Sequence, residues 1–284
     1  MRIAFFGEDA FSVTVLDSLV KCGHSVLAAY CPVYNNIIYK RLEGYCGTNS
    51  ICFKRLSDFT DSSFIKELKE LDLDLIVVCH FQKILIKELI DIPKFGSINL
   101  HPSLLPLYRG MSPQHWPIIN GDSETGVSIH FIDEGVDTGD IIIQEKVLID
   151  NDTYVFDLQN RMKKVYATIV KDALKLIENQ KKAFIKQSHL AGSYYGKLKK
   201  RECEINLEMS CLDAYNLIRA VSFPYYGARY NDLIVWKARV VDKDKIPNVE
   251  MIDKTLGLVE IKNEKYIQFK DGVLNIEKSE KYEK

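Results

Sequence analysis

An asparagine and a histidine two residues apart stand at the end of an apolar run. In the stretch SINLHPSLLPLYRG (97–110), Asn99 and His101 close a short expected strand, and a proline-stiffened loop follows them. Because alternate residues of an extended chain point to the same side, both side chains should face one pocket. The amide can stabilise a developing negative charge, and the imidazole can handle a proton.

A carboxylate completes this set. The turn DEGVDTGD (133–140) follows the next expected strand and carries Asp137 at its tip. In open α/β sheets, ligands bind outside the carboxyl ends of the strands, so the three side chains should gather at one site, where the carboxylate orients the imidazole. A histidine after a strand is more often a structural residue, and an aspartate in a glycine turn often serves the turn itself. From composition alone, the structural interpretation would be favoured.

Other kinds of site lack their patterns. His101, His115 and His130 have no clustered cysteine or second-histidine spacing, so we expect no metal. The segment FGEDAF has one glycine instead of the G-x-G-x-x-G of a dinucleotide site, and no phosphate-binding G-x-x-x-x-G-K-[ST] loop is present. Ser103 lacks the G-x-S-x-G turn of many serine hydrolases.

Short apolar runs and amphipathic segments alternate through the first half of the chain. Strands are expected at 2–7, 26–31, 73–80, 97–101, 126–133 and 141–149, and helices at 11–19, at 64–71 and from an N-cap at Thr153 to about 179. We interpret residues 30–50 as a loop and short helix beside a site. This order predicts an α/β fold with a doubly wound, mostly parallel sheet.

Beyond about residue 188 the sequence becomes polar and rich in turn-forming residues. One helix at 212–221 and several short strands predict a smaller β-rich C-terminal domain, so we expect a catalytic domain at 1–188 and a second domain at 189–284.

Composition argues for a small-molecule partner. The 284 residues carry a net charge of −1. The chain as a whole therefore has no positive electrostatic field that would attract nucleic acid or an acidic membrane. The seven cysteines are scattered, which is typical of reduced thiols in the cytosol. No run approaches the roughly 18 apolar residues of a membrane span, and the first residues do not match a signal peptide. We therefore expect a cytoplasmic protein that binds neither nucleic acid nor membrane.

Two motifs carry a family resemblance over roughly residues 1–180. INLHPSLLPLYRGMSP and TGVSIHFIDEGVDTGDII resemble the formyltransferases that use N10-formyltetrahydrofolate, through their Asn-x-His, SLLPxxRG and D-x-G-x-D-T-G-D patterns. The resemblance implies that Asn99, His101 and Asp137 are the catalytic residues. It also implies that the folate lies between residues 80–85, the SLLP turn and the 133–140 loop. The implied folate contacts are Phe81, Lys83, Ile84, Leu85, Leu104, Asp133 and Val136.

The acceptor amine depends on the second domain. The segment LIRAVSFPYYGARY (217–230) resembles nucleotide-sugar N-formyltransferases, which implies substrate contacts at Arg109, Phe223, Tyr225 and Tyr226. Of the two adjacent tyrosines, one should stack on a base and the other should pack inward. INLE (205–208) departs from the acidic residue and tryptophan that relatives often carry there.

We therefore expect formyl transfer to the amine of a dTDP-linked amino sugar in lipopolysaccharide or other surface-glycan synthesis, by a homodimer. The alternatives are a methionyl-tRNA formyltransferase and a non-catalytic folate-binding relative. Residues 190–284 hold 17 Lys and Arg against 15 Asp and Glu, a net charge of +2. This positive charge is small for a domain that binds transfer RNA.

Overall fold

The computed structural model describes residues 1–8, 10–33, 40–179, 184–188, 191–246 and 256–282. The chain divides into two compact units, each assembled from three separate segments. Unit 1 comprises 1–110, 126–147 and 161–194, and unit 2 comprises 111–125, 148–160 and 195–284. The domain boundary expected near residue 188 stays a prediction.

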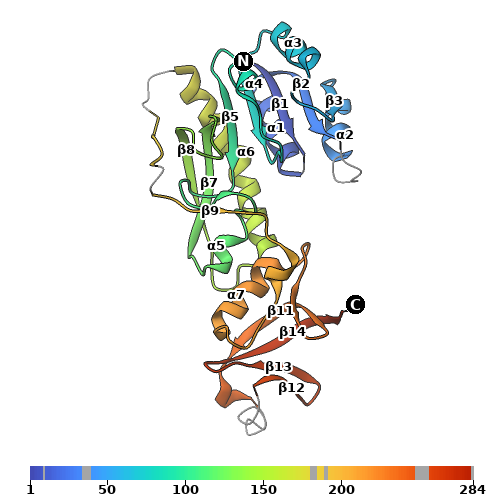
Figure 1. Cartoon of the computed structure of the whole chain (residues 1–284), viewed down its shortest axis with the longest axis vertical. Coiled ribbons are helices and arrows are strands. Elements are labelled where there is room, and N and C mark those ends of the chain that lie inside the picture. Colours follow the sequence, from blue (N-terminus) through green and yellow to red (C-terminus); the bar gives the residue numbers. More distant parts are fainter. Residues whose placement is uncertain (9, 34–39, 180–183, 189–190, 247–255, 283–284) are drawn as a thin grey trace. The chain divides into compact units, whose positions relative to one another are not determined.

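A seven-stranded sheet forms the centre of unit 1 (Figure 1). Its order is β3-β2-β1-β4-β5-β7-β8. The first five of these strands pair in parallel, and β7 runs antiparallel to β5. Chain order reverses between β1 and β4, which is where open α/β sheets bind their ligands. The expected mostly parallel α/β fold is therefore confirmed. The strands are β1 Arg2–Gly7, β2 Ser25–Pro32, β3 Cys52–Leu56, β4 Leu75–Cys79, β5 Ser97–His101, β7 Glu124–Phe131 and β8 Ile141–Leu148.

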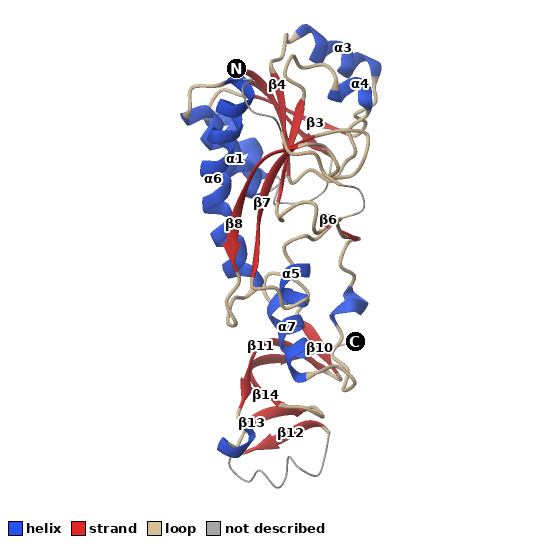
Figure 2. Cartoon of the chain, turned by 90° about the vertical axis from the view of Figure 1, so that its left-hand side faces the viewer, coloured by secondary structure: helices blue, strands red, loops and turns tan. Residues whose placement is uncertain are grey.

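Helices cover both faces of this sheet. Figure 2 shows α1 (Ala10–Lys21) and α6 (Val155–Asn179) along one face and α3 (Ser62–Glu70) and α4 (Lys87–Ile90) on the other. The apolar residues expected on the first helix, Phe11, Val15, Leu16 and Leu19, are all buried. No helix in the described ranges is long and apolar enough to cross a membrane.

The helix expected from Thr153 begins two residues later. The Thr153 hydroxyl accepts from the Asp150 amide at 2.9 Å, whereas the amide of Tyr154 donates to the Asp157 carboxylate at 3.2 Å. The Thr153 side chain therefore belongs to the preceding turn, and Tyr154 is the residue before α6. Within 30–50, the short helix is present as α2 (Lys40–Thr48), and 34–39 lie outside the described residues.

A five-stranded antiparallel sheet forms unit 2, which confirms the expected β-rich C-terminal part. Its order is β10-β11-β14-β13-β12, with bounds Ala228–Tyr230, Leu233–Val241, Val273–Lys281, Glu264–Gln268 and Gly257–Ile261. Helix α7 (Cys211–Val221) and the short α5 (Trp116–Ile119) belong to the same unit, as do the 3₁₀ turns η2 (Lys200–Cys203) and η3 (Lys243–Lys245). The strands β6 (Arg109–Gly110) and β9 (Tyr194–Tyr195) form a separate pair.

A buried arginine fastens α7 to earlier chain segments of unit 2. The Arg219 guanidinium donates to the carbonyl oxygens of Asp150 at 3.1 Å and Thr153 at 2.9 Å, and to the side chain of Asn216. Hydrogen bonds from a charged donor are stronger than those between neutral groups. The bonds from Arg219 to Asp150 and Thr153 therefore help to fix the position of α7 against residues 148–160.

Candidate active site

Asn99 and His101 lie at the end of β5, and Asp137 reaches them from the loop between β7 and β8. The Asn99 Nδ2 donates to Asp137 Oδ1 at 3.2 Å. Nδ1 of His101 lies 3.6 Å from Asp137 Oδ2, which is within ion-pair range but too long for a hydrogen bond. The structure thus brings the three predicted residues together around one carboxylate. Their catalytic roles stay predictions.

A second histidine completes this cluster and was missed in the sequence as a site residue. His130 lies on β7 directly opposite Asn99 of β5. Its Nε2 is 3.3 Å from Asn99 Nδ2 and 3.4 Å from Asp137 Oδ1, and the side chain is almost fully buried. His130 stands within the quoted stretch TGVSIHFIDEGVDTGDII, but only the register of β5 against β7 shows that it meets Asn99.

The Asp137 backbone is held in the left-handed region, at φ +54°. This conformation is uncommon outside glycine, although aspartate tolerates it better than most residues. The Gly110 amide donates to Oδ2 at 2.9 Å, and Gln187 Nε2 donates to the Asp137 carbonyl at 3.0 Å. At Gly139 a Cβ would lie 1.9 Å from the carbonyl oxygen of Phe131, so a larger residue does not fit there. The loop is therefore tightly determined.

Arg109 supports this loop from inside unit 1. Its side chain is buried and donates to Gln187 Oε1 at 2.8 Å, to the Ser188 carbonyl at 3.3 Å and to the Asp137 carbonyl at 3.2 Å. These partners engage the guanidinium inside the protein. Arg109 therefore supports the Asp137 loop, and the substrate contact expected of it stays a prediction.

Burial and charge set the protonation states of the cluster. Burial lowers the pKa of His101, although the Asp137 carboxylate and the Tyr108 carbonyl oppose this shift. Burial pushes the pKa of Asp137 upward, but His101, His130 and the Gly110 amide together outweigh it and hold the pKa well below its usual range. At neutral pH the site therefore holds an ionised carboxylate beside a neutral His101.

Three of the expected folate contacts are packing residues. Phe81 packs edge-on against Phe6 at 5.5 Å and Phe59 at 5.0 Å between ring centroids. Leu85 is 7 % exposed and belongs to the same core cluster. Leu104 is half-buried, and its Cδ2 lies 2.5 Å from where a Cβ on Gly126 would stand. All three side chains have packing partners within the protein, and their folate contacts stay predictions.

The other four expected folate residues lie at the surface. Ile84 is 82 % exposed and Val136 is 41 % exposed, and Lys83 and Asp133 are exposed as well. The Asp133 carboxylate accepts from the Gly135 amide at 3.0 Å and from the Thr138 hydroxyl at 2.6 Å, so it also serves the turn. Exposed apolar side chains such as Ile84 and Val136 remain available to a ligand.

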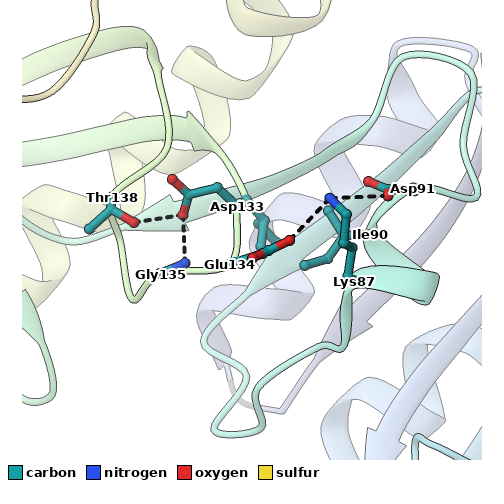
Figure 3. Close-up of a pocket in the computed structure, with 8 residues that line it drawn as sticks. Lys87, Ile90, Asp91, Asp133, Glu134, Gly135 and Thr138 are labelled. Carbon is teal, nitrogen blue, oxygen red and sulfur yellow. Dashed lines mark hydrogen bonds and ion pairs between the residues drawn. The ribbon is translucent and has the colours of Figure 1, made fainter.

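A hollow of about 640 Å³ lies between α4 and the start of the Asp137 loop (Figure 3). Its volume is in the range of typical small-molecule sites, which is about 300–1,000 Å³. Lys87 Nζ lies 3.2 Å from Glu134 Oε1 and 3.4 Å from Asp91 Oδ2 (Figure 3). The lining residues are Lys87, Ile90, Asp91, Ile132, Asp133, Glu134, Gly135 and Thr138.

The adjacent tyrosines of unit 2 have opposite surroundings. The Tyr225 hydroxyl accepts from the side-chain amides of Gln159 and, at 3.4 Å, Gln114, and its ring meets His115 edge-on at 4.3 Å between centroids. Tyr226 is 40 % exposed and Phe223 is 68 % exposed. Tyr225 therefore packs inward and Tyr226 faces outward, and the base contact expected of one of them stays a prediction.

Comparisons with known proteins give a consistent picture of the fold. Residues 1–174 match the family model described as formyl transferase, and 197–284 match its C-terminal domain. The methionyl-tRNA formyltransferase of Fusobacterium nucleatum is 32% identical over 255 residues, which cover 87% of this chain and 82% of that protein. The corresponding protein of Clostridioides difficile is 40% identical over 195 residues, covering 68% of this chain and 63% of the relative.

Solved structures extend the likeness to the whole chain. WlaRD, a sugar 3N-formyl transferase crystallised with dTDP and 5-N-formyl-THF, is 24% identical with a TM-score of 0.76, covering 100% of this chain and 98% of that one. An N-formyltransferase from Helicobacter canadensis, in complex with folinic acid and dTDP-3-aminofucose, is 22% identical with a TM-score of 0.74, covering 99% of both chains. A 4-N formyltransferase from Francisella tularensis is 25% identical with a TM-score of 0.64, covering 81% of this chain and 91% of that one.

Proposed function

The chain belongs to the formyl transferase family, and on that premise we propose that it transfers the formyl group of N10-formyltetrahydrofolate to the amine of a dTDP-linked amino sugar. The observation that carries the choice of acceptor is the exposed aromatic pair of unit 2, Phe223 and Tyr226. An aromatic face at the surface can stack on a nucleotide base, which gives the enzyme remote binding energy for a small reacting group.

Two further observations support a sugar nucleotide. Sugar N-formyltransferases solved with dTDP or dTDP-3-aminofucose match this fold over nearly their full length. The weak basic excess of +2 in residues 190–284 offers little to a polyanion, because each phosphate contact with RNA needs a Lys or Arg.

The chemistry we propose for the cluster follows from its protonation states. The folate supplies an activated formyl group. The acceptor amine must lose a proton as its nitrogen bonds to the formyl carbon, and a neutral His101 can accept it. Nε2 of His101 lies 2.8 Å from the Tyr108 carbonyl, so Nε2 holds the ring hydrogen and Nδ1 is the accepting atom. Asp137 then stabilises the imidazolium, which can return the proton to the departing N10 as the bond between N10 and the formyl carbon breaks.

We place the folate at the hollow beside the Asp137 loop. Ile90 and Ile132 offer an apolar surface, and the backbone around Gly135 offers hydrogen-bonding groups to a flat heterocycle. Exposed Ile84 and Val136, on the two expected folate segments, can extend this surface. The residues therefore fit the group. The cytoplasmic location, the homodimer and the role in surface-glycan synthesis stay predictions.

Methionyl-tRNA formyl transfer is a second candidate, because the curated relatives with 30–40% identity carry that name. Transfer from folate to either kind of acceptor needs the same cluster. Similarity to these relatives therefore supports formyl transfer more than it decides the acceptor.

A product assay separates these functions. Purified protein is incubated with formylated folate and either dTDP-, UDP- and GDP-linked amino sugars or methionine-charged initiator tRNA, and products are identified by mass spectrometry. We expect a gain of one formyl group on a dTDP-amino sugar, with a rate that changes little between 50 and 200 mM salt. Formylation of the tRNA alone would establish the second candidate. Folate binding without transfer to any amine would indicate a non-catalytic relative.

A further inference from the structure

The Asn99 amide is turned toward the cluster. Its Nδ2 donates to Asp137 Oδ1 at 3.2 Å and lies 3.3 Å from Nε2 of His130. A side-chain amide has two N–H groups, and these two partners use both. An amide held in this way has no N–H left for the oxygen of a formyl group, although that is the role expected of it.

The hydrogen positions on His130 decide this arrangement. Nδ1 of His130 lies 2.7 Å from the Phe131 carbonyl, which can only accept, so Nδ1 carries a hydrogen. In the neutral imidazole Nε2 therefore has the lone pair, and it accepts one N–H of Asn99. In the protonated imidazole Nε2 becomes a donor, and Asp137 Oδ1 is the acceptor nearest to it, at 3.4 Å.

We propose that His130 is a positioning residue for formyl transfer, which orients the Asn99 amide according to whether Nε2 accepts or donates. Protonated His130 donates to Asp137 and releases one N–H of Asn99 toward the formyl oxygen. Neutral His130 holds that N–H inside the cluster. This inference rests on the proposed formyl transfer, but it is independent of which amine is the acceptor.

Two groups from neighbouring segments face Nε2 of His130. The ionised Asp137 carboxylate on the β7–β8 loop is its one charged neighbour among the contacts described, and the Asn99 amide of β5 is neutral. The His101 ring, 6.5 Å away between centroids, is held neutral by burial and so adds little repulsion at neutral pH.

The test combines NMR on the folded protein with kinetics. The ¹⁵N shifts of His130 Nε2 and Asn99 Nδ2 are followed from pH 5 to 9 without substrate. We expect both to change at one common pH, and kcat of the wild type to fall about tenfold across that same pH, since one hydrogen bond is worth about that factor. His130→Gln places a permanent amide donor near Nε2, so it should keep the low-pH rate and lose this step.

A matched control is His24→Gln, which alters a histidine at the turn between α1 and β2 that the cluster does not contact. It should keep the wild-type pH profile. The proposal is overturned if Asn99 Nδ2 does not respond as His130 titrates, or if His130→Gln keeps the wild-type step in kcat. Failure of the wild type to formylate any amine would overturn the proposed function instead, and the substrate-free NMR would still decide how Asn99 is held.

Discussion

The two adjacent tyrosines of unit 2 should separate substrate binding from folding. Tyr226 is 40 % exposed, so part of its ring is open to a ligand. Replacing it by alanine should raise KM for the sugar nucleotide by about 1–3 kcal/mol in binding terms. This corresponds to roughly 5- to 150-fold at RT ≈ 0.6 kcal/mol. KM for folate should not change, and Tyr226→Phe should keep most of the affinity because the ring remains.

Tyr225→Ala should act on stability instead. The change removes an edge-on ring contact with His115, worth about 0.5–1.5 kcal/mol, and two hydrogen bonds from Gln159 and Gln114, worth about 1 kcal/mol each. The sum is about 3 kcal/mol, which should lower the urea midpoint clearly while KM changes little.

Steady-state kinetics and urea denaturation of both alanine variants decide the assignment. A stable Tyr225→Ala protein with a raised sugar-nucleotide KM would reverse the roles of the two residues. If neither variant changes that KM, the base binds elsewhere and the acceptor proposal loses its main support.

Three further predictions concern the cluster and its supports. His101→Ala or Asp137→Ala should lower kcat by ~10²-fold or more, while folate affinity measured by titration stays near the wild-type value. Arg109→Lys keeps the charge but loses the forked donor set to Gln187, so it should lower both kcat and the urea midpoint, and unchanged values would contradict its structural role. Burial lowers the pKa of His115 from 6.5 to about 4, so the unfolded chain binds this proton first as pH falls. Stability should therefore drop by about 3 kcal/mol between pH 6.5 and 4, and urea midpoints of His115→Gln should show a smaller drop.

The sequence was sufficient for most of the architecture because hydrophobic periodicity is a local signal. The strands around Phe6 and Asn99 and the long helix α6 were all expected close to their observed bounds. The same local rule placed Asn99 and His101 on one side of β5. The turn chemistry around Asp137 then brought the carboxylate to them.

Contacts that depend on register or distant partners were not predictable. His130 meets Asn99 because β7 pairs with β5 in one register, which no local pattern specifies. The burial of Arg109 depends on Gln187, 78 residues later, so the sequence could not show it. Phe81 looked like a ligand contact, yet its aromatic neighbours come from β1 and from the segment before α3.

The interleaving of the two units has a consequence for how the chain is made. Unit 1 is not complete until residue 194 has left the ribosome, and by then residues 111–125 and 148–160 of unit 2 have been synthesised without the rest of that unit. They must wait for α7, whose Arg219 donates to the carbonyls of Asp150 and Thr153. A gene cut at residue 188 would therefore separate this arginine from two of its acceptors, so the C-terminal half is not an independent module for grafting onto another catalytic domain.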